Sequence, residues 1–429
     1  MFEYVASGLA HTRITKKGLK ELQAINPNDP VIELINKMIS SFNFDHHKIS
    51  FLFNAYTELG IGETFSKIIA PTTLNNIYSD SGGLQMVTLG HGSTPELKDK
   101  IYNTQSRLST IGMAFDEIPV ETNGGKSERN DTNARFFNKK IVHEKATLTG
   151  KNLKRQIEIF SQNGNNSCKP MMIIQGNCYD TYQQWTDIVL KEVGHNNWKY
   201  IKGISSGAAA LGQGTLEDFK RLFYMTHLEL PNDFKVNHYH LLGVGSPSRM
   251  LPVYSLLKNG SIAKDCLISY DSTTHTSGLS LGTYFYNNNL MNFNQYKDKN
   301  FYDVFNDINT NNRNFGFPEI DEDMLFCRIS QPALWNDKYG HDTYSEFHTI
   351  FSYLLGSIYN FMKCIDQLKD DNVFFEDFCD RKGLLNPLNT YTSCRDLKDF
   401  GQWEHLFSKV LRSKSVNSKE DVPSLDSLF

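Results

Sequence analysis

The stretch that decides the fold is "VNHYHLLGVGSPSRMLPVYSLLKNGSIAKDCLISYDS", residues 236–272. Its two ends, 236–243 and 266–272, are short β-type segments that finish in small or polar residues, which predicts two strands. The segment between them, 246–260, opens with Ser-Pro, continues in a helical pattern and closes with Asn-Gly, which predicts a helix. A strand, a helix and a strand in this order indicate a parallel sheet covered by helices.

The same alternation recurs earlier in the chain. Segment 93–109 starts with Ser93 or Thr94 as a helix cap and has Pro95 in its first turn, and 214–228 is similar. Seven predicted strands favour a TIM (β/α)8 barrel, and a doubly wound sheet is the alternative because the sequence reveals no eighth strand. The five further strand segments are 48–53, 75–80, 110–116, 170–176 and 199–206.

Two stretches interrupt the alternation and predict loop insertions into a barrel that covers residues 1–320. Segment 121–155 carries nine lysines and arginines against four acids, and 284–315 is rich in Asn, Tyr and Phe. A mostly helical C-terminal subdomain is expected over 321–412, followed by a flexible tail over 413–429. Within it, 344–368 reads as a long apolar helix that packs on the barrel exterior or at a partner interface.

Composition excludes several protein classes. The 429 residues are 39% hydrophobic and 21% charged, with a formal net charge of −4, so the chain as a whole is not a basic nucleic-acid binder. No apolar run approaches the ~20 residues that cross a bilayer, and the first residues lack the apolar core of a signal peptide. Seven scattered cysteines argue against a disulfide framework, which favours a cytoplasmic location.

Polar residues and glycine turns follow the predicted strands. Because functional residues of an α/β barrel lie at the carboxyl ends of its strands, they should meet at one mouth. An acid at a strand end is more often a helix cap or turn former, but this set as a whole suits a flat polar ligand. The residues are Asp80, Asp116, Gln175, the Ser206-Gly207 turn, Gly243 and Asp271.

Five ordered motifs give the chain a resemblance to a known family. They are "SDSGGLQ" (79–85), "STPELKDKIYNTQSRLSTIGMAFDE" (93–117), "IIQGNCYD" (173–180), "GISSGAAALGQG" (203–214) and "HLLGVGSP" (240–247). Over residues 70–280 the chain resembles the tRNA-guanine transglycosylases. The resemblance implies a TIM barrel that exchanges guanine in a polynucleotide for a 7-deazaguanine, through a covalent bond between an aspartate and the sugar.

The resemblance leaves two positions for the nucleophilic aspartate. Asp265 precedes a cysteine, as in the bacterial Phe-Asp-Cys motif, and its spacing from Gly245 fits better. Asp271 lies in "SYDST", which is similar to the archaeal Phe-Asp-Ser motif, and would end the strand at the mouth rather than begin it. Strand geometry therefore favours Asp271. Asp80 matches the family's general acid/base, and two carboxylates in one cleft push their pKa values apart.

The resemblance also implies a base-binding set. Asp116 matches the acid that accepts the two donors of the guanine edge, and Gln175 matches an amide that contacts the base. Leu84 and Leu242 would hold the two ring faces, where the bacterial enzymes have an aromatic residue and a methionine. The remaining expected contacts come from Ser81, Gly82, Gly83, Ser206, Gly207 and Gly243.

The ligands of the family's zinc site are missing from the corresponding stretch of this sequence. Only Cys327 remains of its cysteines, Ile329 and Pro332 stand at the other positions, and Tyr359-Asn360 replaces the distal histidine motif. No metal or other cofactor is expected. His238 and His240 form a ligand-like pair, although two histidines on one strand face are more often hydrogen-bonded inside a barrel. A metal-dependent barrel hydrolase is therefore one alternative.

These departures make the chain most similar to the DNA-modifying 7-deazaguanine transglycosylases of bacteria and bacteriophages. The expected partners are DNA, with its guanine flipped out or single-stranded, and a free 7-deazaguanine base, with a homodimer implied by resemblance only. If the chain is phage-encoded, the location is the host cytoplasm. A tRNA substrate and a non-catalytic scaffold subunit are further alternatives. The expected nucleic-acid contacts are Lys126, Arg129, Arg135, Lys139, Lys140 and His275, and a mixed-charge solvated loop is the alternative for 121–155.

Overall fold

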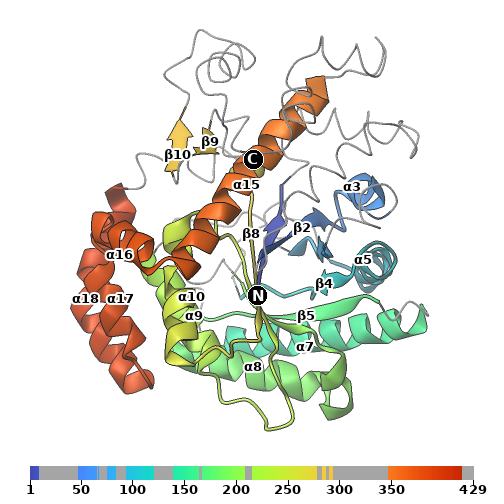
Figure 1. The fold of residues 1–429 in the computed structure, drawn as a ribbon. Helices are drawn as coiled ribbons and strands as arrows, with labels where there is room; N and C mark the ends of the chain where they lie inside the picture. The colour runs from blue at the N-terminus through green and yellow to red at the C-terminus, as the bar shows by residue number, and fades with distance from the viewer. Residues whose placement is uncertain are drawn as a thin grey trace.

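Eight parallel strands close into a barrel in the computed structural model (Figure 1). It describes residues 1–8, 47–64, 66, 75–83, 93–119, 139–163, 167–207, 215–277, 283–286, 289–292 and 346–417. Each strand pairs with its neighbours in sequence, and the last pairs with the first. The strands are β1 (Phe2–Ala6), β2 (His47–Asn54), β3 (Ile77–Asp80), β4 (Ile111–Met113), β5 (Lys169–Ile174), β6 (Gly203–Ser206), β7 (His238–Leu241) and β8 (Leu267–Ser272).

The closed barrel confirms the predicted fold and excludes the doubly wound sheet. All seven predicted strands are present, and β1 is the eighth strand that the sequence did not reveal. It closes the ring between β2 and β8, with Val5 beside Ser50 on one side and Asp271 on the other. Closure removes both free sheet edges, as expected for this architecture.

Helices follow most strands and cover the barrel. In α5, the Thr94 side chain accepts a hydrogen bond from the Leu97 N–H at 3.3 Å and Pro95 occupies the first turn, so Thr94 is the cap. No helix in the described part of the chain is long and apolar enough to cross a membrane. The helices between strands are α3 (Leu59–Thr64), α5 (Pro95–Leu108), α7 (Lys139–Gln162), α8 (Tyr179–Val193), η2 (His195–Tyr200), α9 (Thr215–Thr226), η3 (Pro247–Met250) and α10 (Leu251–Asn259), with α11 (Thr274–Ser277) after β8.

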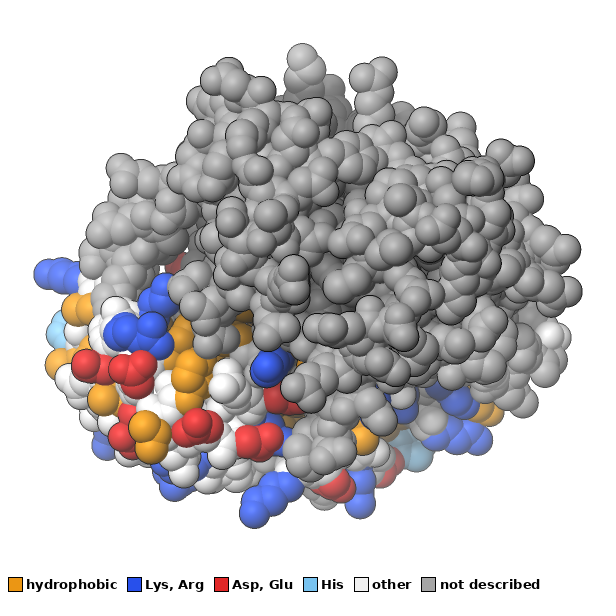
Figure 2. All heavy atoms as spheres, turned by 45° about the horizontal axis from the view of Figure 1, so that its top comes forward, with side chains coloured by type: hydrophobic (Ala, Val, Ile, Leu, Met, Phe, Trp, Pro, Cys, Tyr) orange, Lys and Arg blue, Asp and Glu red, His pale blue; other side chains and the backbone are white. Residues whose placement is uncertain are grey.

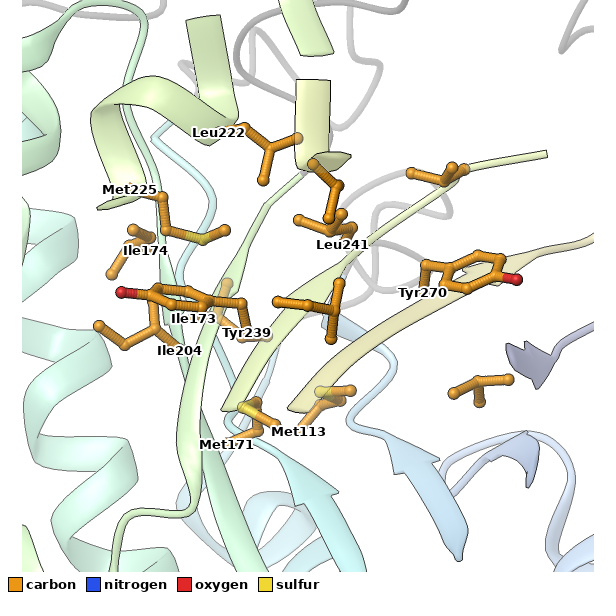
Figure 3. Packing of buried hydrophobic residues seen from close by; sticks show 14 of the residues in the cluster. Met113, Met171, Ile173, Ile174, Ile204, Leu222, Met225, Tyr239, Leu241 and Tyr270 are labelled. Atoms are coloured by element: carbon orange, nitrogen blue, oxygen red, sulfur yellow. The ribbon is translucent and has the colours of Figure 1, made fainter. Parts of the chain in front are cut away.

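The outward faces of the strands are apolar and pack against these helices. Figure 3 shows Leu222 and Met225 of α9 directed toward Ile174 of β5 and Leu241 of β7. All four side chains are at most 2% exposed. This layer fixes each strand against its helix and so determines where the strand ends lie.

Helix α7 corrects part of the expected insertion at 121–155. Residues 139–155 belong to a 24-residue helix, whereas 120–138 lie outside the described residues. The buried residues Val142, Ala146, Leu153 and Ile157 recur at helical spacing and face the barrel. The charged residues between them had concealed this apolar stripe in the sequence.

Four helices make up the described C-terminal residues 346–417, and the first of them covers the seam between β8 and β1 (Figure 1). Phe361 of α15 (Glu346–Asp370) lies 5.6 Å from the Tyr4 ring and 6.0 Å from the Tyr270 ring. The predicted apolar helix is thus on the barrel exterior. The others are α16 (Asn372–Arg381), α17 (Leu385–Thr392) and α18 (Leu397–Asn417).

Two further boundaries differ from those expected. Helix α18 runs to Asn417, so residues 413–417 are helical rather than part of a tail. The expected insertion at 284–315 begins with an antiparallel pair of strands, β9 (Thr283–Tyr286) and β10 (Asn289–Asn292). Residues 293–345 and 418–429 lie outside the described residues.

Candidate active site

The carboxyl ends of the strands bring together the acids and the amide selected from the sequence. Asp80 is the last residue of β3 and Asp271 the fifth residue of β8. Asp116 and Gln175 follow β4 and β5, and the Gln175 Nε2 donates a 2.7 Å hydrogen bond to Asp116 Oδ2. The charge of Asp271 acts on the pKa of Asp80, and that of Asp80 on the pKa of Asp116. These groups therefore form one electrostatically coupled cluster.

Asp80 is held by donors on both carboxyl oxygens. Its Oδ1 accepts the Ser81 N–H at 2.8 Å and its Oδ2 accepts the Asn54 side-chain amide at 3.2 Å. Burial raises the pKa of Asp80 to about 6, the Ser81 and Gly82 N–H groups oppose this rise, and the negative charge of Asp271 adds to it. Gly82 has a φ of +77°, which only glycine adopts without strain, so the turn suits this sequence. Asp80 can thus hold or release a proton near neutral pH.

Asp116 is 9% exposed and lies against two glycines of the mouth. Burial raises the pKa of Asp116 to about 7, the Gln175 hydrogen bond opposes the rise and the charge of Asp80 adds to it. A Cβ at Gly83 would lie 3.1 Å from the Asp116 carbonyl oxygen, and one at Gly207 would lie 2.0 Å from Gln175 Nε2. The glycines therefore permit the close approach that keeps the acid–amide pair in place.

Asp271 has one oxygen held and one oxygen open. The Gly243 N–H donates to Asp271 Oδ1 at 2.9 Å, and His240 Nε2 lies 3.6 Å from the same oxygen. Oδ2 has no hydrogen-bond partner among the described residues, and the residue is 9% exposed. Asp265, by contrast, precedes β8 and lies exposed at the opposite end of the barrel. Only Asp271 of these two aspartates faces the mouth.

The Leu242–Gly243 turn beside Asp271 is fixed by a buried ion pair. Arg249 of η3 donates to the Gly243 carbonyl and makes two hydrogen bonds to Asp218 of α9, at 2.5 and 2.8 Å. Arg221, also on α9, donates to the Leu242 carbonyl at 3.0 Å. This set, Asp218, Arg221 and Arg249, holds the backbone that carries the Gly243 N–H.

Several buried polar atoms at the mouth have no partner within the described residues. They are the hydroxyls of Ser81 and Ser205 and the Gln175 Oε1 atom. The Ser206 hydroxyl is also unpartnered, but Ser206 pairs in register with the outward-facing Ile174 and Leu241, so its side chain lies on the helix-facing side of the barrel. Because a buried polar atom without a partner costs free energy, such atoms mark a place where a ligand can supply the missing hydrogen bonds. Their mixed donor and acceptor character suits a planar ligand with both kinds of group on its edge.

The sequence analysis did not identify two residues that contact the acids at the mouth. Asn54 ends β2 directly across from Asp80 in the strand register, and its amide holds that carboxylate. A polar residue immediately after the predicted strand 48–53 was the available signal. His240 had been considered only as a metal ligand or a satisfied core histidine, but it lies between Ser269 and Asp271. The position of His240 beside Asp271 depends on the register of β7 and β8, for which the sequence gives no direct signal.

Three of the expected nucleic-acid contacts, Lys126, Arg129 and Arg135, lie outside the described residues, as does the expected base-binding residue Leu84. Lys139 begins α7, and Lys140 beside it is exposed. Figure 2 shows acidic and basic side chains interspersed over the described part of the face that it draws.

The prediction that His275 contacts nucleic acid is wrong, because this residue is buried. It is 1% exposed and packs against Phe361 at 4.2 Å and Tyr4 at 5.9 Å between ring centroids. Burial lowers the pKa of His275 to about 3, so it is an uncharged core residue. It therefore does not present a surface for a phosphate group in this structure.

The described residues contain no group of three or more His, Cys, Asp or Glu side chains that could hold a metal ion. His238 and His240 both contact Ser269 rather than a third ligand. Cys327, Ile329 and Pro332 lie outside the described residues, and Tyr359 and Asn360 are buried in α15.

The chain matches no protein-family model and no curated protein.

Proposed function

We propose that the protein replaces guanine in DNA with a 7-deazaguanine base through a covalent bond between Asp271 and the sugar. The observation that carries the proposal is the carboxylate of Asp271, which has Oδ1 held by Gly243 and Oδ2 open at the mouth. A carboxylate fixed in this way is oriented for attack on a carbon atom. The choice of DNA rests on the motif departures described above.

The proposed reaction has two half-steps. Asp271 Oδ2 attacks C1′ of the nucleotide while the C1′–N9 bond breaks, and its electron pair leaves with guanine. Asp80, whose burial raises its pKa to about 6, gives the departing base its proton. The incoming 7-deazaguanine returns a proton from N9 to Asp80, and N9 then attacks C1′ and releases the Asp271 carboxylate.

Base recognition is assigned to Asp116 and Gln175. A guanine edge presents N1–H and an exocyclic amine, and an ionised carboxylate accepts both. The Gln175 amide nitrogen donates to Asp116, so its Oε1 atom remains available to a base. The unpartnered hydroxyl of Ser205 provides a further hydrogen bond on the neighbouring strand.

An exchange assay tests the proposal. Purified protein is incubated with labelled guanine or a 7-deazaguanine base and, in parallel, with duplex DNA, single-stranded DNA and tRNA. We expect exchange into DNA, and a covalent protein–DNA adduct on a denaturing gel that requires Asp271. Asp271→Asn should abolish the adduct. The matched control, Asp265→Asn, alters the exposed aspartate at the other end of β8 and should retain it.

Each contrary result has a defined meaning. Exchange into tRNA alone would overturn the DNA assignment. An adduct that survives Asp271→Asn and disappears with Asp265→Asn would move the nucleophile. A protein that neither exchanges bases nor forms an adduct with any of these polynucleotides would favour a scaffold role.

A further inference from the structure

One side of the barrel interior is polar, which is unusual because branched apolar residues dominate this layer in most such barrels. Glu3 of β1 is fully buried and accepts hydrogen bonds from four side chains: Ser50, Asn75 at 2.8 Å, Asn76 at 2.7 Å and Tyr78 at 2.7 Å. Four donors satisfy the hydrogen-bonding capacity of this carboxylate. A series of hydrogen-bonded polar side chains begins at Glu3 and leads toward the mouth.

Ser269 of β8 joins two buried histidines in the next layer. Its Oγ lies 2.6 Å from His238 Nε2 and 2.7 Å from His240 Nδ1. The Tyr78 hydroxyl lies 3.4 Å from His238 Nε2, and the Tyr78 ring stacks on His240 at 5.4 Å. The polar side chains thus run continuously from Glu3 to His240, which is 0% exposed.

The Ser269 hydroxyl links the tautomer of His240 to that of His238 and also makes a hydrogen bond to Tyr78. Burial lowers the pKa of His238 well below its usual value, so this ring is neutral. If His238 Nε2–H donates to Ser269, the Ser269 hydroxyl donates to His240 Nδ1, and the remaining proton of His240 lies on Nε2. That nitrogen is 3.6 Å from Asp271 Oδ1. The opposite polarity would direct a lone pair at the carboxylate, which is unfavourable.

We propose that His240 is a positioning residue for Asp271, held by Ser269 with its Nε2–H toward Oδ1. Together with the Gly243 N–H at 2.9 Å, this group fixes one carboxyl oxygen and leaves Oδ2 directed at the substrate. The inference rests on the proposed function for what Asp271 does, whereas the contact of His240 with Asp271 rests on the 3.6 Å distance. That distance is longer than a hydrogen bond, and the buried Nε2 atom has no hydrogen-bond partner among the described residues, so its interaction with Oδ1 is electrostatic.

The polar and charged groups around His240 come from several strands. Asp271 and Ser269 face it from β8, Tyr78 and Asp80 from β3, Ser205 from β6 in the strand register, and His238 from its own strand. Glu3 of β1 acts through Tyr78. Both carboxylates at the mouth thus interact with the His240 ring.

The first test measures the pairing without any substrate. In full-length protein with ¹⁵N-labelled histidine, ring-nitrogen chemical shifts report which nitrogen carries the proton, and His240→Gln assigns the signals. We expect Nε2 protonated at neutral pH, and a change in the Nε2 signal in Asp271→Asn while the His238 signals stay constant. A proton on Nδ1 alone, or signals unchanged by Asp271→Asn, would overturn the pairing.

The second test separates positioning from packing. Glutamine places an amide nitrogen near the position of Nε2, whereas phenylalanine keeps the ring that stacks on Tyr78 but has no donor. We expect the rate of adduct formation to fall about 100-fold in His240→Phe and about 10-fold or less in His240→Gln, because misdirected reacting groups cost rates of that order. The KM for the incoming base should remain within about twofold, since this positioning acts only in the attack step.

The outcomes of the two tests keep the two proposals distinct. If wild type forms the adduct and His240→Phe equals it in rate, the positioning role is wrong and the proposed function stands. If wild type forms no adduct but the ¹⁵N signals show the pairing, the proposed function fails and the pairing stands.

Discussion

The carboxyl group of Asp116 lies among polar neighbours but is almost completely removed from water. Its hydrogen bond from Gln175 does not offset the cost of burying a negative charge, and the pKa of Asp116 is raised to about 7. Asp80 is affected in the same way, with a pKa raised to about 6. Acids in this state reduce stability at neutral pH, which is common at sites arranged for chemistry rather than for folding.

Asp116→Asn should therefore stabilise the protein at high pH and much less at low pH. The folded-state pKa is raised above the unfolded value, so the stability that protonated Asp116 contributes is present below about pH 4 and is lost as pH rises through about 7. We expect a gain on the order of 2 kcal/mol at pH 8, measured by thermal unfolding across pH 4.5–8.5.

Asp380→Asn, at an exposed position of α16, controls for the loss of one carboxylate. A gain for Asp116→Asn that is equally large at both ends of the pH range would contradict this explanation.

At the scale of the element, the loop after β7 is held more firmly than loops usually are. Asp218 joins α9 to η3 through Arg249 and lies 3.3 Å from Arg221, with side-chain exposures of 3%, 15% and 2% for these three residues. The two arginines donate to the carbonyls of Leu242 and Gly243. Removal of the shared carboxylate would leave two guanidinium groups without their common partner.

Asp218→Asn should cost about 3–5 kcal/mol, as expected when one partner of a buried ion pair is removed. Urea unfolding followed by circular dichroism measures the loss. The matched control is Asp99→Asn, which breaks an ion pair to Arg155 at 2.7 Å whose side chains are 35% and 46% exposed. That change should cost about 1 kcal/mol or less. Equal costs for the two variants would show that the loop is not held by this pair.

At the scale of the molecule, the C-terminal helices share a core with the barrel helices. Trp403 of α18 stacks on Phe219 of α9 at 5.0 Å and donates to the Pro387 carbonyl at 2.8 Å. Tyr391 of α17 donates to the Phe219 carbonyl at 3.0 Å, and Tyr254 of α10 donates to the Ile365 carbonyl at 2.8 Å. These contacts indicate that the described C-terminal helices and the barrel unfold together.

Trp403→Ala should destabilise the whole protein by about 3–5 kcal/mol, since Trp403 is 1% exposed and leaves a large cavity. We expect one transition, with tryptophan fluorescence and far-ultraviolet circular dichroism changing together. Leu406→Ala, at a position on the same helix that is 63% exposed, should change stability by about 0.5 kcal/mol or less. Two separated transitions would indicate that the C-terminal helices unfold independently.

The sequence predicted the barrel from strands that each end in small or polar residues, and it missed β1 for a physical reason. Glu3 is the second residue of "FEYVA" and points inward, so this short strand lacks the apolar character of a buried segment. Its partner β2 begins at His47, far along the chain. The need for an eighth strand was recognised, but its position depends on contacts between distant segments.

The predicted strand-end acids follow from the barrel rule, whereas their supporting residues do not. Asp80, Asp116 and Asp271 were selected because each ends or follows a strand. Asn54 and His240 act on these acids across neighbouring strands, through registers that pair Asn54 with Asp80 and His240 with Ser269. Side-chain interactions between strands leave no periodic pattern in a single sequence, so these two roles are apparent only in the folded barrel.

The two sides of the barrel interior have different tolerance to mutation. On the inward faces of β4 and β5, residues such as Met113 and Met171 contribute volume alone, so another apolar side chain of similar size can replace them. On the opposite side, hydrogen bonds link the polar side chains from Glu3 to His240, and the loss of one side chain leaves its neighbour buried without a partner. Random variation should therefore accumulate on one side of the barrel and be removed from the other.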